Sequence, residues 1–373
     1  MKRGEKAMRR VLVSGYYGFG NAGDEAILMS IVESLKSLRN DIQITALSAN
    51  PQSTMDQHGI NAVQRTNPLA VLRELSRADL VISGGGGLLQ DATSSRSIPY
   101  YLFIVYMAKK LNKKVMFYAN GVGPVYREMN KRIIRLIGNT VDFITVRDEK
   151  SKQQLIDLGI TKPSIVVTAD PAFVLSPIQD EIGKRILEKQ GITITQDRPH
   201  IGISLRSWNL EKSHKTIAGA CDYLIKNHNA SIIFLPMQYP NDYYESLHVI
   251  KHMKGHAQIP NTPLGPKELL WLSGKMDMIF GMRLHALIFG AMMCVPIVGL
   301  IYDPKVEFFL QRVEQPSAGK PGELDLITLC HLLENVLQNK DEIKKQLKEA
   351  KKDHEDLAMK NAVYAVSLLG GEL

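Results

Sequence analysis

The sequence is poor in cysteine, and its few cysteines form no recognisable motif. The 373 residues include only Cys221, Cys294 and Cys330, which lie far apart, with no CxxC pair and no Cys/His ligand spacing. A structural zinc site and a disulfide framework are therefore disfavoured, and a reducing compartment fits best. Since no other residues have the spacing of metal ligands, no metal requirement is predicted.

Long apolar runs are missing as well. The basic segment Met1–Arg10 is followed by an apolar run of three residues, Val11–Val13, which is too short for a signal peptide. The longest apolar stretch, residues 281–302, contains Arg283 and His285, which are costly inside hydrocarbon. We therefore expect neither export nor a transmembrane span, and the predicted location is cytoplasmic.

The chain does carry a moderate excess of positive charge. It has 46 lysines and arginines against 38 acidic residues, a formal charge of +8, which suits an anionic partner. The basic residues are scattered, without aromatic platforms or a known nucleic-acid-binding motif, so nucleic acid is disfavoured. Hydrophobic residues make up 45% and charged residues 23%, ordinary values that exclude a disordered or collagen-like chain.

The length and the alternation of element types predict two α/β domains. A chain of 373 residues exceeds one typical domain. Short strand-like runs alternate with helical patterns from residue 9, and the series starts again at residue 200, which is typical of parallel α/β architecture. We expect two Rossmann-like domains, residues 1–177 and 178–373, facing a cleft, with a C-terminal helix packing back on the body.

A glycine-rich segment follows the first expected strand. It reads Gly15-Tyr-Tyr-Gly-Phe-Gly-Asn-Ala-Gly-Asp24-Glu25 and leads into a helix, whose positive end suits an anion or a polar ligand. It lacks the Gly-Lys-Ser/Thr of a P-loop, and the second strand ends at Asn50 with no acid to hold a ribose, so NAD is disfavoured. For Asp24, a helix N-cap and a ligand-facing role are both open.

Three later strands also end in residues suited to ligand binding. A strand over residues 79–83 runs into Gly84–Gly87, and two others end in Arg147 and Arg206. Four glycines carry a high cost in backbone entropy, so either a ligand approaches that backbone closely or a strand and a helix cross tightly there. Carboxyl ends of parallel strands bind ligands in α/β sheets, although a structural salt bridge would explain either arginine alone.

The strongest motif is Gly281-Met-Arg283-Leu-His285-Ala, where a strand passes into an apolar helix. Neither Arg283 nor His285 belongs in a buried segment unless something pairs with it. The next strand ends in Tyr302-Asp-Pro-Lys305, which adds a cation at the same edge of the sheet. These residues predict an anion-binding site in the second domain.

Together these motifs resemble those of the polysaccharide pyruvyl transferases. The resemblance covers nearly the whole chain and rests on residues 17–25, Gly84–Gly87, Arg147-Asp148, Asp170-Pro171 and Gly281–Ala286. It implies a glycosyltransferase-B-like fold, phosphoenolpyruvate (PEP) as donor, a ketal product and no metal or organic cofactor. It further implies a lipid-linked sugar acceptor ending in N-acetylmannosamine, as in enzymes that pyruvylate a secondary cell-wall polymer for surface-layer anchoring.

The donor chemistry suits the candidate residues of this family. The carboxylate and phosphate of PEP require several fixed cations, for which the candidates are Arg147, Arg206, Arg283 and Lys305. Ketal formation also needs a proton at the methylene carbon. His285 is the expected donor of that proton, and its alternative role is to bind the leaving phosphate.

The acceptor is expected on the first domain, and PEP on the second. Asp24 or Glu25 would deprotonate or orient a sugar hydroxyl, and further substrate contacts are assigned to Tyr17, Asn21, Gly84, Gly85 and Gly86. The donor site is expected in the cleft, with Arg283, His285 and Lys305 from the second domain. A lipid-linked acceptor leaves room for peripheral contact with the inner face of a membrane.

Two other interpretations fit the same motifs. A sugar-nucleotide-dependent glycosyltransferase of the same fold would use the glycine turns and cations on a diphosphate. A non-catalytic nucleotide- or glycan-binding protein would use Arg283 and His285 only to hold its ligand. The motifs do not predict the oligomeric state, the acceptor linkage or the stereochemistry of the ketal.

Overall fold

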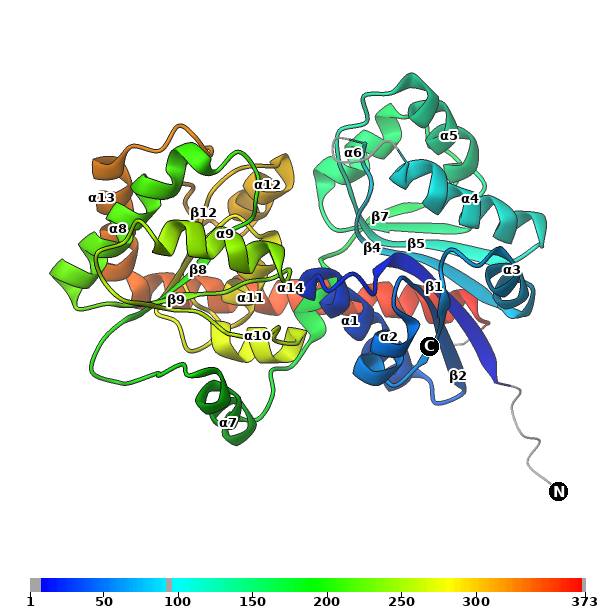
Figure 1. Cartoon of the computed structure of the whole chain (residues 1–373). Helices are drawn as coiled ribbons and strands as arrows, with labels where there is room; N and C mark the ends of the chain where they lie inside the picture. The colour runs from blue at the N-terminus through cyan, green and yellow to red at the C-terminus, as the bar shows by residue number, and fades with distance from the viewer. Residues whose placement is uncertain (1–7, 92–95, 371–373) are drawn as a thin grey trace. The chain divides into compact units, whose positions relative to one another are not determined.

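The computed structural model describes residues 8–91 and 96–370, which form two compact α/β units (Figure 1). The first unit is made of the chain up to Gly20, Asp24–Val174 and the residues from His354 onward. The second unit is made of Asn21–Gly23 and Leu175–Asp353. Both are the α/β units that the alternating sequence pattern predicts.

The first unit is built on a seven-stranded sheet in the order β3-β2-β1-β4-β5-β6-β7, and all neighbouring strands are parallel. Its strands are β1 (Arg9–Tyr17), β2 (Ile42–Ser48), β3 (Asn61–Gln64), β4 (Leu80–Leu89), β5 (Lys114–Val122), β6 (Phe143–Val146) and β7 (Ile165–Val167). The central strands are buried almost throughout because helices cover both faces, which explains their continuous apolar sequences.

Two helical layers cover this sheet. Its helices are α1 (Ala22–Leu38), α2 (Pro51–His58), α3 (Pro68–Arg77), α4 (Ser97–Lys110), α5 (Glu128–Gly138), α6 (Glu149–Asp157) and the end of α14 (Lys340–Leu368). One core layer contains apolar side chains of α1 and α14, among them Ile27 and Ala365. The other contains those of α3 to α6, among them Val71, Leu102 and Leu155.

The second unit has a five-stranded parallel sheet in the order β10-β9-β8-β11-β12. Its strands are β8 (His200–Ser204), β9 (Ser231–Phe234), β10 (Ala257–Gln258), β11 (Met278–Gly281) and β12 (Ile297–Gly299). Its helices are α7 (Asp180–Gln190), α8 (His214–His228), α9 (Asn241–Ile250), α10 (Pro266–Ser273), α11 (Leu284–Met292), α12 (Pro304–Arg312), α13 (Leu326–Gln338) and the start of α14. No helix in the described ranges is long and apolar enough to cross a bilayer.

The C-terminal residues depart from the predicted division at 177/178. The predicted second domain includes all residues from 178 to 373, whereas the residues from His354 onward belong to the first unit. Ala362, Ala365 and Val366 are buried in the core of that unit. Buried Asn361 also accepts a hydrogen bond of 2.8 Å from Thr168 Oγ1. The C-terminal helix does pack on the body, and its last part completes the first unit.

In each unit the strand order reverses at one point, between β1 and β4 in the first sheet and between β8 and β11 in the second. Ligands of open α/β sheets bind outside the carboxyl ends of the strands at such a point. The glycine-rich segment lies at this position in the first unit, and Arg206 and Arg283 lie there in the second.

Candidate anion-binding site

The second unit brings three cationic side chains to the carboxyl ends of its strands. Arg206 follows β8 by two residues, Arg283 follows β11 by two, and Lys305 lies in the first turn of α12 after β12. Because β8 and β11 pair directly, with Gly281 opposite Ser204, the two arginines leave neighbouring strands at the same level. This is the edge of the sheet that the sequence analysis indicated.

Arg206 and Lys305 lie against the ring of Tyr302. The guanidinium carbon of Arg206 is 4.6 Å from the ring centroid, and Lys305 Nζ is 5.6 Å from it. Lys305 also forms an ion pair of 3.2 Å with Asp303. Arg206 Nε, in contrast, is buried and has no hydrogen-bond partner among the described residues. An unpaired buried donor on a charged group is costly, so Arg206 is the side chain here that most needs an anion.

Tyr302 was not predicted as a site residue, although the sequence places it next to Asp303 and Lys305. Burial acts to raise the pKa of Tyr302, but Lys305, Arg206 and Arg283 outweigh burial and hold it below the usual value of a phenol. The positive charges of these three side chains therefore all act on the hydroxyl of Tyr302. No local sequence pattern marks Tyr302, because its environment is created by residues of three different segments.

We predict that Tyr302 ionises at a lower pH than an exposed tyrosine and that bound inorganic phosphate, by offsetting the cations, raises its pKa again. The absorbance of tyrosinate during an alkaline titration measures this. The earliest-ionising tyrosine is expected to disappear in Tyr302→Phe and to persist in Tyr126→Phe, since Tyr126 is 70% exposed. If a tyrosine of Tyr302→Phe still ionises at this lower pH, the three cations do not lower the pKa of Tyr302.

Arg283 is held by a buried carboxylate. Its Nε donates to Asp242 Oδ2 at 2.8 Å, and its Nη2 donates to Asp242 Oδ1 at 2.5 Å and to Gln238 Oε1 at 3.0 Å. Asp242 is fully buried and also accepts from the backbone N–H groups of Met237 and Gln238. Burial raises the pKa of Asp242, and the charge of Arg283 opposes that rise.

This arrangement argues against the predicted catalytic role of Arg283. Since Asp242 occupies two of its donor groups, the geometry supports a positioning role, in which Arg283 fixes the turn between β9 and α9 beside Arg206. Asp242 and Gln238 were missed by the sequence analysis. The only sequence signal was an acid in the expected first turn of a helix, which is too common to identify a partner 41 residues away.

A cavity of about 430 Å³ opens beside the two arginines. Besides Arg206 and Arg283, its lining includes Gln238, Asn241 and Glu245. This volume lies within the range of small-molecule sites, and the lining is mostly polar. Neither Lys305 nor His285 is among the lining residues, so the cavity joins only part of the predicted donor site.

His285 lies in the first turn of α11, half-buried and packed against Gly23. A Cβ atom at Gly23 would overlap the imidazole, so only glycine leaves room for the ring in this position. Phe289 approaches the ring edge-on, with centroids 6.5 Å apart. Gly23 is part of the second unit. The backbone N–H of its neighbour Ala22 donates a hydrogen bond of 2.8 Å to Met237 O, which ties this segment to that unit. These contacts fix where the imidazole lies.

The start of helix α1 rules out one of the two roles left open for Asp24, that of helix N-cap. Helix α1 begins at Ala22, so the residue at the N-cap position is Asn21, and Asp24 lies within the first turn. The side-chain oxygen of Asn21 accepts a hydrogen bond of 3.0 Å from Gly23 N–H. Asn21, predicted to bind substrate, therefore has a structural role as a helix cap.

Tyr17 and Glu25 are buried, which argues against their predicted contacts with substrate. Tyr17 is 1% exposed, and its hydroxyl donates to Gly84 O at 2.9 Å. Glu25 is 5% exposed, accepts from Gly18 N–H at 2.8 Å and lies 3.0 Å from His58 Nε2. Both side chains hold the glycine-rich segment from inside the first unit.

The glycines of β4 are explained largely by a helix crossing. A Cβ on Gly85 would overlap Ile27 of α1, and one on Gly84 would lie 3.0 Å from Ile31 Cδ1. Gly85 and Gly86 also have positive φ angles of 59° and 79°, which favour glycine. Gly86 lies against a carboxylate, because its Cβ would be 3.1 Å from Asp24 Oδ1. Asp24 and Gly86 therefore lie together at the reversal point of the first sheet.

Arg147 has a structural partner. Its side chain is 7% exposed, donates from Nη1 to Asp170 Oδ2 at 3.2 Å and lies over Gly121, where a Cβ would be 2.5 Å from Nη2. The salt bridge left open by the sequence analysis is thus present, and it argues against Arg147 as a substrate ligand. Asp170, which the sequence singled out as a motif residue, is the partner.

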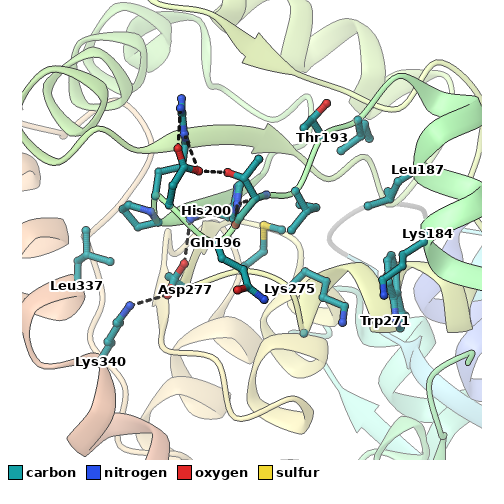
Figure 2. Close-up of a pocket in the computed structure, with 18 of the residues that line it drawn as sticks. Lys184, Leu187, Thr193, Gln196, His200, Trp271, Lys275, Asp277, Leu337 and Lys340 are labelled. Carbon is teal, nitrogen blue, oxygen red and sulfur yellow. Dashed lines mark hydrogen bonds and ion pairs between the residues drawn. The ribbon is translucent and has the colours of Figure 1, made fainter. Parts of the chain in front are cut away.

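A second, larger cavity lies elsewhere in the second unit. It measures about 1200 Å³ and lies at the opposite, amino ends of the strands, where His200 begins β8 and Asp277 precedes β11 (Figure 2). Several of its charged groups form ion pairs, as Lys340 does with Asp277 at 2.6 Å. Because α/β sheets bind ligands at carboxyl ends, we place the candidate site in the smaller cavity.

In the described part of the chain, no group of three His, Cys, Asp or Glu residues is arranged to hold a metal ion.

The two parallel sheets and the cations at their strand ends define a two-domain α/β protein of the glycosyltransferase-B-like class. Comparison with protein families assigns it further: residues 21–304 match the model for polysaccharide pyruvyl transferases. The chain belongs to this family. It is 20% identical to the amylovoran biosynthesis protein AmsJ of Erwinia amylovora, over 97% of this chain and all of that protein.

Solved structures share the fold at low identity. A putative UDP-N-acetylglucosamine 2-epimerase from Listeria monocytogenes superposes with a TM-score of 0.69 at 14% identity, covering 97% of this chain and 96% of its own. The MnaA protein of S. aureus, solved with UDP, gives the same TM-score and identity over 98% of this chain and 99% of its own. At such identities the likeness shows the fold alone.

Proposed function

We propose that the protein transfers the enolpyruvyl group of PEP to a sugar, forming a pyruvate ketal and releasing phosphate. The observation that carries this proposal is Arg206, whose buried Nε lacks a partner among the described residues and lies beside a polar cavity. Lys305 and Arg283 add positive charge around the same point. The phosphate and carboxylate of PEP are ligands that such cations favour. Membership of the pyruvyl transferase family supports the reaction class.

The proposed reaction has two bond-forming steps. One sugar hydroxyl forms a bond to the central carbon of PEP, while the methylene carbon takes a proton and becomes a methyl group. The neighbouring hydroxyl then displaces phosphate from the same carbon, and its proton leaves with the phosphate. We propose His285 as the donor to the methylene carbon, held in place by Gly23, with binding of the leaving phosphate as its alternative role.

We assign the acceptor to the first unit. Of the two carboxylates predicted to act on the sugar hydroxyl, we propose Asp24 as the base, because Glu25 is buried inside the first unit against Gly18 and His58. Asp24 is half-buried against Gly86 at the reversal point of the sheet, where ligands of this fold class bind. Its carboxylate would accept the proton of the attacking hydroxyl.

The acceptor we propose is a lipid-linked precursor of a secondary cell-wall polymer, modified at terminal N-acetylmannosamine on the cytoplasmic side. This follows the resemblance of the motifs to the bacterial cell-wall pyruvyltransferase CsaB, whose product anchors surface-layer proteins. The name of AmsJ refers to the biosynthesis of amylovoran.

A sugar-nucleotide-dependent glycosyltransferase is the second candidate, because a protein of the same fold was solved with UDP. Two measurements separate the candidates. PEP is expected to raise the melting temperature, whereas UDP-sugars leave it unchanged. Release of inorganic phosphate from PEP is expected only when a sugar acceptor is present, with a matching gain in acceptor mass. Stabilisation by UDP-sugars and no phosphate release would favour the glycosyltransferase, and PEP binding without turnover would favour a binding protein.

We predict that activity survives chelation by EDTA. Arg206, Lys305 and Arg283 supply the positive charge that a divalent cation would otherwise provide to phosphate, and the described residues form no metal-ligating group. Phosphate release is measured before and after dialysis against EDTA. Complete loss that is restored by magnesium would contradict this prediction.

A further inference from the structure

The first unit exposes an apolar surface on the outer side of three adjacent helices. Helix α4 packs against α3 and α5, which lie with it on one side of the sheet in Figure 1. We call the outer surface of these helices the α3–α5 face. Six large apolar side chains of this face are between 43% and 79% exposed: Leu69, Leu72, Phe103, Tyr106, Met129 and Leu136. Single exposed apolar residues are ordinary, but six on three neighbouring helices indicate an interaction surface.

Helix α4 shows most clearly that this face lacks a cover. Its exposed positions are Pro99, Phe103, Tyr106 and Lys110, at helical spacings of four, three and four residues. The opposite side of the helix packs into the core, so α4 is apolar both inward and outward. A helix with this pattern is normally covered on both sides. Among the described residues no other element is arranged to cover the α3–α5 face.

The charge of the same helices indicates what covers them. Helices α3, α4 and α5 contain seven basic and two acidic residues, which gives them a formal net charge of +5. The whole chain has a formal net charge of +8. Arg73, Lys110 and Arg132 are exposed on the three helices, and Lys110 Nζ lies 5.4 Å from the ring of Tyr106. Aromatic and aliphatic side chains interleaved with lysine and arginine are typical of surfaces that bind anionic lipid headgroups. Protein interfaces, in contrast, are depleted in lysine.

We propose that the α3–α5 face docks on the surface of an anionic lipid bilayer. Phe103 and Leu136 would enter the boundary between headgroups and acyl chains, while Lys110 and Arg132 contact lipid phosphates. The docking does not depend on the reaction proposed above, although a lipid-linked acceptor would explain why the enzyme needs it. Each exposed apolar side chain contributes to the binding free energy by leaving water. Each cation contributes through its attraction to the negative surface potential of the bilayer.

Vesicle flotation with the full-length protein tests this proposal. The wild type is expected to float with vesicles of phosphatidylglycerol and phosphatidylcholine, not with phosphatidylcholine alone, and to be released by added salt. The variants Phe103→Ser/Leu136→Ser and Lys110→Glu/Arg132→Glu are each expected to lower the partition coefficient about tenfold or more. The matched control Ile327→Ser alters a side chain that is 67% exposed on α13, and its binding is expected to be unchanged.

Three results would overturn the proposal: no binding of the wild type to anionic vesicles, binding that neither double variant reduces, or a wild-type dimer that Phe103→Ser/Leu136→Ser converts to monomer. The last would identify the face as a subunit interface. Melting temperatures of all variants show whether they fold, and the charge variant keeps the apolar residues intact. Phosphate release on a soluble acceptor is measured in parallel, so failure of pyruvyl transfer and failure of docking are distinguished.

Discussion

Replacing Arg206 by alanine is expected to lower phosphate release about a hundredfold to a thousandfold and to abolish measurable PEP binding. Arg206 combines positive charge with a buried Nε that lacks a partner among the described residues. Loss of one preorganised donor to a charged oxygen has effects of this size in other enzymes. Arg206→Lys is expected to recover only part of the activity, because lysine keeps the charge and loses the planar fork.

The matched control for Arg206 is Arg198→Ala. Arg198 is an exposed arginine of the same unit, paired with Asp197, and it does not line the candidate cavity. Its removal is expected to change neither PEP binding by calorimetry nor phosphate release. If Arg206→Ala binds PEP as tightly as the wild type does, the donor is not held at this cavity.

The variant His285→Ala is expected to lose turnover far more than stability. General acid catalysis contributes about a hundredfold to ten-thousandfold in rate, equivalent to roughly 3 to 5 kcal/mol of transition-state stabilisation. Removing the imidazole leaves the buried apolar face of α11, with Leu284, Leu287 and Ile288, in place. The melting temperature is therefore expected to stay close to that of the wild type.

Phosphate release and thermal unfolding are measured on the same preparation of His285→Ala. His228→Ala serves as the control, since His228 pairs with Glu334 away from the candidate site and its loss is expected to spare turnover. Near-normal turnover in His285→Ala would remove this residue from the mechanism. Inactivity that comes only with unfolding would assign it to the core.

The sequence predicted the architecture well where apolar strands are long and buried. The expected strands at the starts of both units correspond to β1 and β8, and the motif residues lie at strand ends because parallel strands share a carboxyl edge. No element was predicted between β2 and β4, where the structure has α2, β3 and α3. Strand β3 has four residues, all at least partly exposed, so it lacks the apolar pattern of a buried strand.

The partners of charged residues were not predictable in the same way. The spacing in the chain showed that Arg147, Arg206 and Arg283 follow strands, but not that Asp170 and Asp242 lie beside two of them. These contacts join segments far apart in the sequence, and only the folded topology brings them together. The four consecutive glycines of β4 likewise indicated that some group lies very close to this backbone. The sequence did not show that the group is Ile27 of α1.

Whether the cation cluster of the second unit holds the donor is tested most directly by a crystal structure of the protein with PEP. We predict that an oxygen of the PEP phosphate or carboxylate accepts a hydrogen bond from Arg206 Nε in the cavity that Arg283 also lines. PEP bound instead in the larger cavity at the amino ends of β8 and β11, with Arg206 unchanged, would contradict it.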